Sequence, residues 1–408
     1  MTSVVVRACS EADWAPVLQV DQLAFGYTYD EEENAAERSV LELDRSFLAY
    51  VGDAPVGHTT AFSLRMSVPV GREVPFAGVT WVGVLPTHRR RGVLTALMRR
   101  QLDAVHESGE PVAALHAAEP VIYGRFGFGL ATQRLSVSVL RGHAALEAPV
   151  DPALTARLSE IADARADVEQ VYDAVRRVRA GIPARSDLWW DRCANDPKSA
   201  RDGASERRCV LIEDAAGPRA YAMFAIKHDW QDGSAESELR VREHGATDPA
   251  AAAALWRFLL NVDLVGRVVH ESLAVDDPLL ELLADPRRAR PVRSDAVYVR
   301  LVDLPVALAA RTYDVPYDGV VEVVDGFAPW NAGRWRLALR PDGAECTRTD
   351  AEPDVVLDVR ELGAAYLGGT SLVTRAGAGF VEQRTAGGVA ALGRAFAHEP
   401  APYCPFVY

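Results

Sequence analysis

The sequence lacks the residue patterns that mark disulfide, metal or redox sites. Its five cysteines are odd in number and far apart, and none forms a Cys-x-x-Cys pair, so we expect free thiols. The nine histidines include no His-Glu-x-x-His motif, which excludes a zinc site of that kind. The pairs His270-Glu271 and Glu243-His244 stand alone and favour structural roles. We therefore predict no metal ion.

The sequence also lacks long apolar runs and an excess of basic charge. No apolar segment reaches membrane-spanning length, and the first seven residues have neither the basic start nor the apolar core of a signal peptide. We therefore expect a cytoplasmic protein that does not insert into membranes. The net charge of −13 is unlike that of a nucleic-acid-binding protein, so no nucleic-acid partner is expected. An acidic surface instead favours a cationic partner, such as a polyamine, an aminoglycoside or a lysine-rich peptide.

The 408 residues are enough for several domains, and the patterns of helix and strand divide them into three units. Residues 1–143 predict an α/β unit, residues 144–302 a second mixed unit, and residues 303–408 an α+β unit. The first unit has the clearest elements. Its expected strands are Val4–Arg7, Ser46–Val51, Val56–Met66, Gly78–Val84, Pro111–Ala117 and Arg134–Leu140, and its expected helices begin after Ser10, Asp30 and Gly92.

The most informative segment is residues 81–95, where a β-rich run ends in a short basic turn before an amphipathic helix. Backbone N–H groups at a helix start lack partners and lie at the positive end of the helix dipole, so they can bind a pyrophosphate. Arg89, Arg90 and Arg91 add positive charge, and Gly92 lets phosphates approach the backbone. The segment is neither a Walker loop nor a dinucleotide-binding fingerprint. A basic surface turn that caps an ordinary helix is the alternative.

This segment resembles the R-x-x-G-x-x motif of the GNAT acetyltransferases, as Arg89-x-x-Gly92-x-Leu94. Leu94 stands where the motif usually has a small residue. The later run Y-G-R-F-G-F-G, at residues 123–129, and the three apparent units make the chain similar to the enhanced intracellular survival (Eis) family over its whole length. The resemblance implies an N-terminal GNAT domain, a central degenerate GNAT-like domain without a coenzyme site, and a C-terminal sterol-carrier-protein-like domain. It also implies a homohexamer.

The resemblance implies acetyl-CoA as the co-substrate, bound in the 1–143 unit. The strand end would pair with the pantetheine amides, and the turn would hold the pyrophosphate. The expected coenzyme-binding residues are Val82, Gly83, Val84, Arg89, Arg90, Arg91, Gly92, Val93, Leu94, Thr95, Ala118 and Glu119. Tyr123 follows the expected strand and would serve as the general acid, because a phenol of pKa near ~10 can protonate a departing thiolate. The alternative is that Tyr123 packs between helix and sheet.

The chain ends in an aromatic and apolar segment, Ala401–Tyr408, whereas most termini are polar and mobile. An apolar end favours burial, and the α-carboxylate is carried with it. The resemblance implies that the carboxylate of Tyr408 is the general base. A carboxyl of pKa roughly 3.3–3.7 is a weak base for an alkylammonium, but burial can raise its pKa and a water can relay the proton. Docking for stability alone is the alternative.

The expected reaction is acetylation of a primary amine, on an aminoglycoside-like polyamine or a lysine side chain, by direct attack in a ternary complex. In aminoglycoside-acetylating relatives the residue before the terminal aromatic is acidic, whereas here it is Val407. Asp21 and the acids of residues 30–33 are candidate replacements. Phe25, Asp30 and Trp81 are candidate pocket residues; the alternative for Phe25 and Trp81 is that both pack in the core. The alternative function is an acyl-CoA- or lipid-binding protein on the same scaffold.

Overall fold

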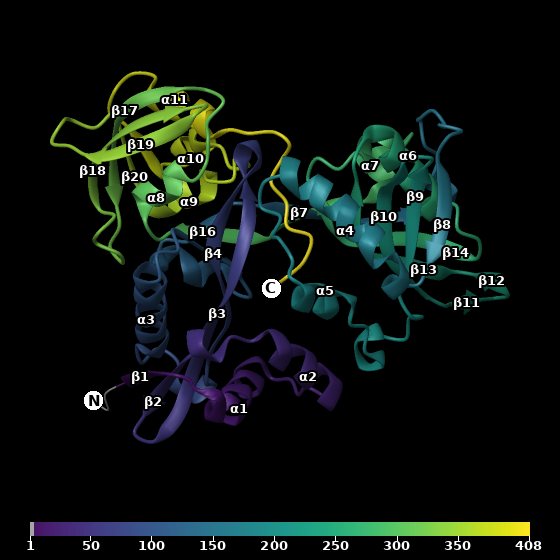
Figure 1. Ribbon diagram of the computed structural model, residues 1–408, viewed down its shortest axis with the longest axis horizontal. Coiled ribbons are helices and arrows are strands. Elements are labelled where there is room, and N and C mark those ends of the chain that lie inside the picture. Colours follow the sequence, from purple (N-terminus) through teal and green to yellow (C-terminus); the bar gives the residue numbers. More distant parts are fainter. Residues whose placement is uncertain (1–3) are drawn as a thin grey trace.

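The computed structural model describes residues 4–408, which form three sheets with helices packed against them (Figure 1). Residues 1–3, part of the N-terminus analysed above for a signal peptide, lie outside the described residues. Within the described range, no helix is long and apolar enough to cross a membrane.

The first sheet contains the segment that resembles the GNAT motif. Its strands, in spatial order, are β1 (Val4–Ala8), β2 (Phe47–Val51), β3 (Ala54–Val68), β4 (Arg72–Val84), β5 (Val112–His116), β16 (Val297–Leu301) and β6 (Gly129–Leu130). Its helices are α1 (Trp14–Phe25), α2 (Glu31–Val40) and α3 (Val93–Glu107). The helices predicted after Asp30 and Gly92 are confirmed, whereas Ser10 precedes a 3-10 turn, Glu11–Asp13, and α1 begins after it. Asp30 accepts a bond from Glu33 N–H at 2.8 Å, and Gly26 ends α1 with a φ of 77°.

The second sheet repeats this arrangement in the central part of the chain. Its strands, in spatial order, are β15 (Val292–Asp295), β7 (Gln133–Leu140), β14 (Val265–Ala274), β13 (Ser237–Ala246), β10 (Gly217–Lys227), β9 (Arg208–Asp214) and β8 (Thr155–Ser159). Its helices are α4 (Ile161–Val178), α5 (Asp187–Ala194), α6 (Pro249–Leu260) and α7 (Leu279–Leu282). A separate hairpin is formed by β11 (Trp230–Gln231) and β12 (Ser234–Ala235).

The third sheet belongs to the C-terminal unit. Its strands, in spatial order, are β19 (Gly343–Arg348), β18 (Gly333–Arg340), β17 (Tyr317–Val324), β20 (Val355–Asp358) and β21 (Val381–Gln383). The helices are α8 (Leu304–Ala309), α9 (Val359–Ala365), α10 (Leu372–Gly377) and α11 (Gly388–Phe396). After α11 the chain leaves this unit and runs down between the other two sheets, where it ends (Figure 1).

The first two sheets exchange a strand, which corrects one expectation. We expected Arg134–Leu140 to close the N-terminal sheet, but β7 pairs with β14 and β15 in the second sheet. The N-terminal sheet instead receives β16, which pairs antiparallel with β5 from Val297↔His116 to Leu301↔Val112. Alternation of apolar and polar residues shows that a strand is half-buried, but it does not show which sheet buries it.

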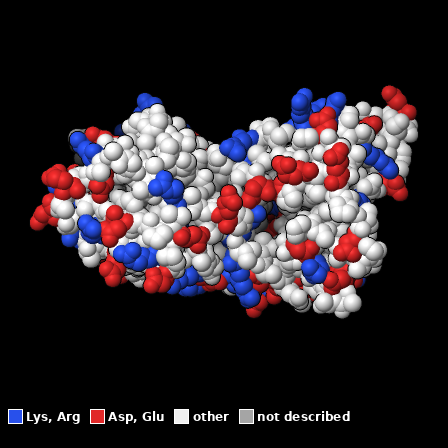
Figure 2. All heavy atoms as spheres, turned by 90° about the horizontal axis from the view of Figure 1, so that it is seen from above, with Lys and Arg blue, Asp and Glu red and all other residues white. Residues whose placement is uncertain are grey.

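Charges of both signs are interspersed over the face drawn in Figure 2. Ion pairs such as Arg157–Glu213, at 3.0 Å, and Arg165–Asp187, at 2.7 Å, are exposed and salt-screened, so each contributes little to stability. The negative net charge therefore does not produce a single acidic face on this side of the molecule.

The burial of His58 makes stability depend on pH. His58 lies in β3 with no exposed surface, and burial lowers its pKa to about 3. The unfolded chain binds a proton near pH 6.5 that the folded chain does not bind, so His58 stabilises the fold above pH 6.5 and this contribution is lost as the pH falls toward 3.

We therefore expect His58→Met to flatten the pH dependence of unfolding. Between pH 7 and pH 5.5 the wild-type free energy of unfolding should lose about 1.3 kcal/mol through His58, and the variant should not show this loss. Urea denaturation at both pH values measures the difference. Equal losses in the two proteins would show that His58 is protonated in the folded state.

Candidate active site

The candidate site is built where two parallel strands separate. β4 and β5 pair from Phe76↔Val112 to Gly78↔Ala114. Beyond Gly78, β4 runs on to Val84 with β3 on one side, and among the described residues no strand pairs with its other edge. This leaves backbone N–H and C=O groups of β4 free to pair with an extended ligand.

A β-bulge shapes β4 at the same place. His58 pairs with Gly83 and Thr60 with Thr80, so β4 has one extra residue between these pairs. Trp81 lies in that stretch with a φ of 50°, which is rare for a bulky residue. Bulges redirect side chains beside active sites, and strain of this kind persists where the surroundings impose it. The Trp81 ring lies against Trp14 and Tyr29, with ring centroids 6.0 Å apart in each case.

The predicted anion site is a free helix N-terminus. The first bond within α3 joins Ala96 N–H to the Gly92 carbonyl at 3.0 Å, so the amides of Val93, Leu94 and Thr95 precede the helical ladder. Gly92 has a φ of 83°, and nothing lies within 4 Å of the position its Cβ would occupy. Arg89, Arg90 and Arg91 are exposed around this opening. The turn can therefore accept a phosphate group from solvent.

Other expected coenzyme residues have mixed surroundings. Val82 packs against the apolar cluster under α3, whereas Gly83 faces α1, where a Cβ would meet Ala24 Cβ at 2.9 Å. The small size of Gly83 therefore serves helix packing. Ala118 and Glu119 are exposed just after β5.

Tyr123 lies on the α3 side of the opening, in the short 3-10 helix Pro120–Phe126. Its ring belongs to the apolar cluster that contains Val79 and Leu115, the first residues of β4 and β5 beyond their pairing. Burial, with a smaller effect of the Glu119 charge, raises the pKa of Tyr123 to about 12. The phenol therefore stays protonated at working pH. A thiolate is the weaker base, so the phenol can donate a hydrogen bond to it as charge develops.

Tyr408 occupies the other face of the same opening. Its ring is 5% exposed and lies 5.5 Å from Phe76 and 5.0 Å from His116, measured between ring centroids. A Cβ on Gly78 would meet the Tyr408 ring at 3.1 Å, so this glycine makes room for the terminal residue. The chain therefore ends against the last pair of β4 and β5.

Alternation along the strands separates the two tyrosines. Val79 and Leu115 face the cluster that holds Tyr123, whereas Phe76, Gly78 and His116 face Tyr408. The opening between β4 and β5 thus has Tyr123 on one face and Tyr408 on the other.

Sequence reasoning missed His116, the last residue of β5. Burial, with a smaller effect of the Arg134 charge, lowers its pKa to about 4, so the imidazole is neutral at pH 7. Its Nε2 is buried without a hydrogen-bond partner in the described chain. A histidine at the carboxyl end of a parallel strand is a signal that could have identified it, because sites form at that edge.

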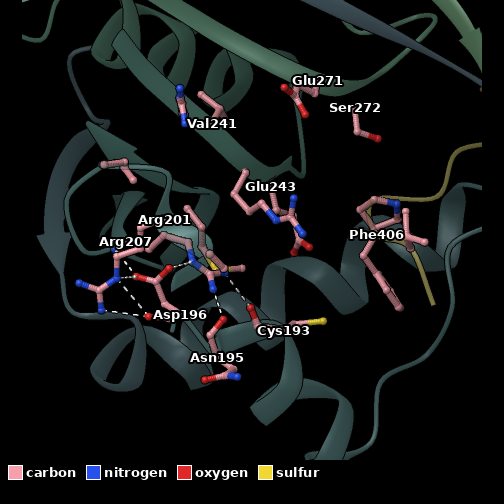
Figure 3. A pocket seen from close by; sticks show the side chains of 18 of the residues that line it. Cys193, Asn195, Asp196, Arg201, Arg207, Val241, Glu243, Glu271, Ser272 and Phe406 are labelled. Carbon is pink, nitrogen blue, oxygen red and sulfur yellow. Dashed lines mark hydrogen bonds and ion pairs between the residues drawn. The ribbon is translucent and has the colours of Figure 1, made fainter. Parts of the chain in front are cut away.

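A cleft of about 660 Å³ lies between the first two sheets and reaches this edge. Tyr29, His116 and Val407 line one part of it, and residues of the central unit line the rest. In the part lined by the central unit, shown in Figure 3, the Asp196 carboxylate accepts a hydrogen bond from Arg207 Nε at 2.9 Å and forms an ion pair with Arg201 Nε at 3.1 Å. Much of the cleft's charge is therefore neutralised by internal pairs.

A buried acid lies next to Tyr29, one of the residues that line the cleft. Asp21 is 1% exposed and accepts a bond from Tyr27 at 2.6 Å, and burial raises its pKa to about 6. Of the predicted pocket residues, Asp30 caps α2 as described above. Phe25 is exposed beside Tyr27, with ring centroids 6.1 Å apart. The structure therefore brings Trp81 and Asp21 close to Tyr29 but gives Asp30 a local role.

The central unit has a helix start that differs from the α3 turn. Asp248 precedes α6 and its carboxylate accepts a bond from Ala251 N–H at 3.0 Å. Pro249 follows and has no N–H to donate. A carboxylate at this end would repel a pyrophosphate. The absence of a coenzyme site from the central unit stays a prediction.

Two of the free cysteines lie at the cleft. Cys193 and Cys404 both line it. Burial raises the pKa of the Cys404 thiol to about 12 and also raises that of Cys193. Both therefore stay protonated and are poor nucleophiles. Within residues 4–408, no group of three or more His, Cys, Asp and Glu side chains is placed to hold a metal ion.

Comparisons with known proteins agree with this architecture. Residues 5–131 and 181–301 match models described as acetyltransferase (GNAT) domains, and residues 304–405 match a sterol carrier protein domain. An N-acetyltransferase of Streptomyces avermitilis is 43% identical over 404 residues, covering 98% of each chain. N-acetyltransferase Eis of Mycobacterium tuberculosis is 33% identical over 392 residues, covering 92% of each. The structure of Eis1 from Mycobacterium abscessus has a TM-score of 0.84 and 32% identity, covering 99% of this chain and all of that one.

We expect Gly92→Glu to raise the KM for acetyl-CoA at least tenfold, because it adds a carboxylate and a strained backbone to the anion site. Gly109→Glu is a matched control, since Gly109 also has a positive φ of 77° and open space around it. It lies at the opposite end of α3, about 22 Å away. Steady-state kinetics measure both variants. The assignment fails if both give the wild-type KM.

We expect Tyr123→Phe to lower kcat by about 10²–10⁴-fold and to leave acetyl-CoA binding intact. Tyr298→Phe is the control, because Tyr298 belongs to the same apolar cluster and its hydroxyl donates to Asp295 instead. Single-turnover rates and melting temperatures should be measured for both. A loss of only a few-fold, or one that follows the melting temperature, would leave Tyr123 a packing residue.

Proposed function

The chain belongs to the Eis family of GNAT N-acetyltransferases, and from that premise we propose that it transfers the acetyl group of acetyl-CoA to a primary amine by direct attack. One observation supports this mechanism most. The terminal Tyr408 lies on one face of the gap between β4 and β5, and Tyr123 and the α3 turn lie on the other. Donor and acceptor can therefore meet in the gap from opposite sides.

In the proposed reaction the amine nitrogen attacks the thioester carbonyl carbon. A C–N bond forms, the C–S bond breaks, and coenzyme A leaves as a thiolate. The ammonium proton passes to the Tyr408 carboxylate, directly or through water, and Tyr123 donates to the departing sulfur. The protonated thiols of Cys193 and Cys404 argue against an acetyl-cysteine intermediate.

The proposed acceptor is a cationic amine, such as an aminoglycoside-like polyamine or a lysine side chain. The cleft is large enough for such a group, and Tyr29, which lines it, stacks on Trp81 with ring planes 15° apart. Aromatic faces attract ammonium groups, and Asp21 lies beneath Tyr27 and Tyr29. We place the enzyme in the cytoplasm.

Turnover of a panel of amines tests this function. Purified protein with acetyl-CoA should release free coenzyme A in the presence of at least one aminoglycoside, polyamine or lysine peptide. If acetyl-CoA binds but no amine is acetylated, the alternative of an acyl-CoA- or lipid-binding protein is favoured.

The family resemblance further supports a homohexamer. Sedimentation of the purified protein should give about six times the 44.3 kDa of one chain. A species at the mass of a single chain would refute this assembly.

The role of the terminal carboxylate can be tested by moving the charge and leaving the ring in place. A Gly-Ser extension after Tyr408 should lower kcat by about 10²–10⁴-fold while the KM for acetyl-CoA stays nearly unchanged. The same dipeptide inserted after Met1 is the control. Normal turnover by the extended protein would show that the base is another group.

A further inference from the structure

The C-terminal segment is bound along the central unit before it reaches the active site. Arg179 donates to the Ala401 carbonyl at 2.7 Å, and Tyr403 N–H donates to the Ala180 carbonyl at 2.9 Å. The same stretch of chain is attached to β3 on its other side, since Ser67 N–H donates to the Ile182 carbonyl at 3.1 Å. Residues 179–185 therefore connect the tail to the N-terminal sheet.

The central sheet has its own opening between parallel strands. β13 and β14 pair from Ser237↔Val265 to Val241↔His270 and then separate. Tyr403 packs in the apolar cluster beside this opening, and its hydroxyl donates to the Ser272 carbonyl on β14. The tail thus places Tyr403 at the opening of the second sheet and Tyr408, five residues later, at the opening of the first.

Arg185 links the second opening to the end of the tail. Its guanidinium has no exposed side-chain surface and donates to both oxygens of Glu243 on β13, at 2.6 and 3.1 Å. The same guanidinium carbon lies 4.4 Å from the centre of the Phe406 ring, two residues before Tyr408. Burial alone would raise the pKa of Glu243, but the charge of Arg185 outweighs it and holds that pKa below its ordinary value. Both groups are therefore charged.

Two further rings complete the enclosure. Tyr172 and Trp190 lie 4.3 and 4.6 Å from the Arg185 guanidinium carbon. A planar guanidinium can stack on several rings and hold a carboxylate in one geometry, which an ammonium cannot do. Phe406 is thus fixed by a group that is itself fixed from three sides.

We infer that the central GNAT-like unit serves as the receptor for the chain's own C-terminal segment, and that Arg185, held by Glu243, is the positioning residue that sets the place of the Tyr408 carboxylate. This inference rests on the proposed role of that carboxylate. In the first sheet, the opening between parallel strands is the proposed place of the thioester. In the second sheet, the equivalent opening holds Tyr403 of the tail.

The experiment replaces the buried pair together, by Arg185→Met with Glu243→Gln, so that no unpaired charge remains inside. Tyr221, which donates to Glu243 at 2.6 Å, can donate to the glutamine oxygen instead. The control is Arg157→Met with Glu213→Gln, an exposed ion pair of the same sheet. Each protein is treated with a carboxypeptidase that prefers aromatic ends, and loss of Tyr408 is followed by mass spectrometry. Kinetics with acetyl-CoA are measured in parallel.

We expect the buried-pair variant to lose Tyr408 at least tenfold faster than the wild type, because the Arg185 guanidinium no longer holds Phe406 and the tail that follows it. Its kcat should fall about 10²-fold, as for a catalytic group displaced by about an ångström, while the KM for acetyl-CoA stays within about twofold. The control variant should match the wild type in both assays. The inference would be overturned if the buried-pair variant lost Tyr408 no faster than the wild type. It would also be overturned if Tyr408 were lost faster while kcat stayed unchanged, provided that the Gly-Ser-extended wild type is inactive.

Combining the variants separates the two hypotheses. If Arg185 acts through the carboxylate, the pair substitution should lower kcat by less than about twofold in the Gly-Ser-extended protein, where the carboxylate is already displaced. An additive loss would show that Arg185 acts elsewhere and would overturn its positioning role. If the extended protein turns over normally, the carboxylate is not the base and Arg185 has no positioning role. The protease assay still decides whether the central unit binds the tail.

Discussion

The separation of β4 from β5 after Gly78 is the constraint on which the rest of the site depends. Paired strands satisfy each other's backbone groups, whereas separated strands leave an open edge and a gap through the sheet. The free edge, the α3 turn and Tyr123 lie toward one face, and Tyr408 and His116 toward the other. The proposed direct transfer uses this access from two sides, because donor and acceptor would then reach one carbon without competing for one pocket.

The arrangement requires the last residues of the chain to be ordered. A free end normally frays, yet Tyr408 is 5% exposed and two rings, Phe76 and His116, pack against it. Contacts from two other parts of the protein hold the preceding residues, so the segment is fixed before it enters the gap. The central unit matches a GNAT domain model, and its helix start at α6 is capped by Asp248.

Local signals in the sequence predicted local structure well. The α3 helix was expected to begin after Gly92 and spans Val93–Glu107, because the glycine and the apolar spacing are encoded within the segment. β4 begins six residues before the predicted Gly78, since Pro75 interrupts the pattern that indicates a strand. Other features depend on which distant segments meet in the fold, and the sequence alone did not predict them. They are the sheet that contains Arg134–Leu140 and the surroundings of His116 and Arg185. The burial of Tyr408 followed from its apolar neighbours, whereas its catalytic role stays a prediction.

The exchange of β7 and β16 has a consequence during synthesis on the ribosome. β5 ends at His116, but its partner β16 begins at Val297, so the N-terminal sheet is incomplete until most of the chain has emerged. At a translation rate of about 5–20 residues per second, the apolar edge of β5 waits roughly 10–40 s for that strand. An uncovered strand edge invites pairing with other chains. A fragment that ends before residue 297 would lack β16 and would leave this edge of β5 uncovered.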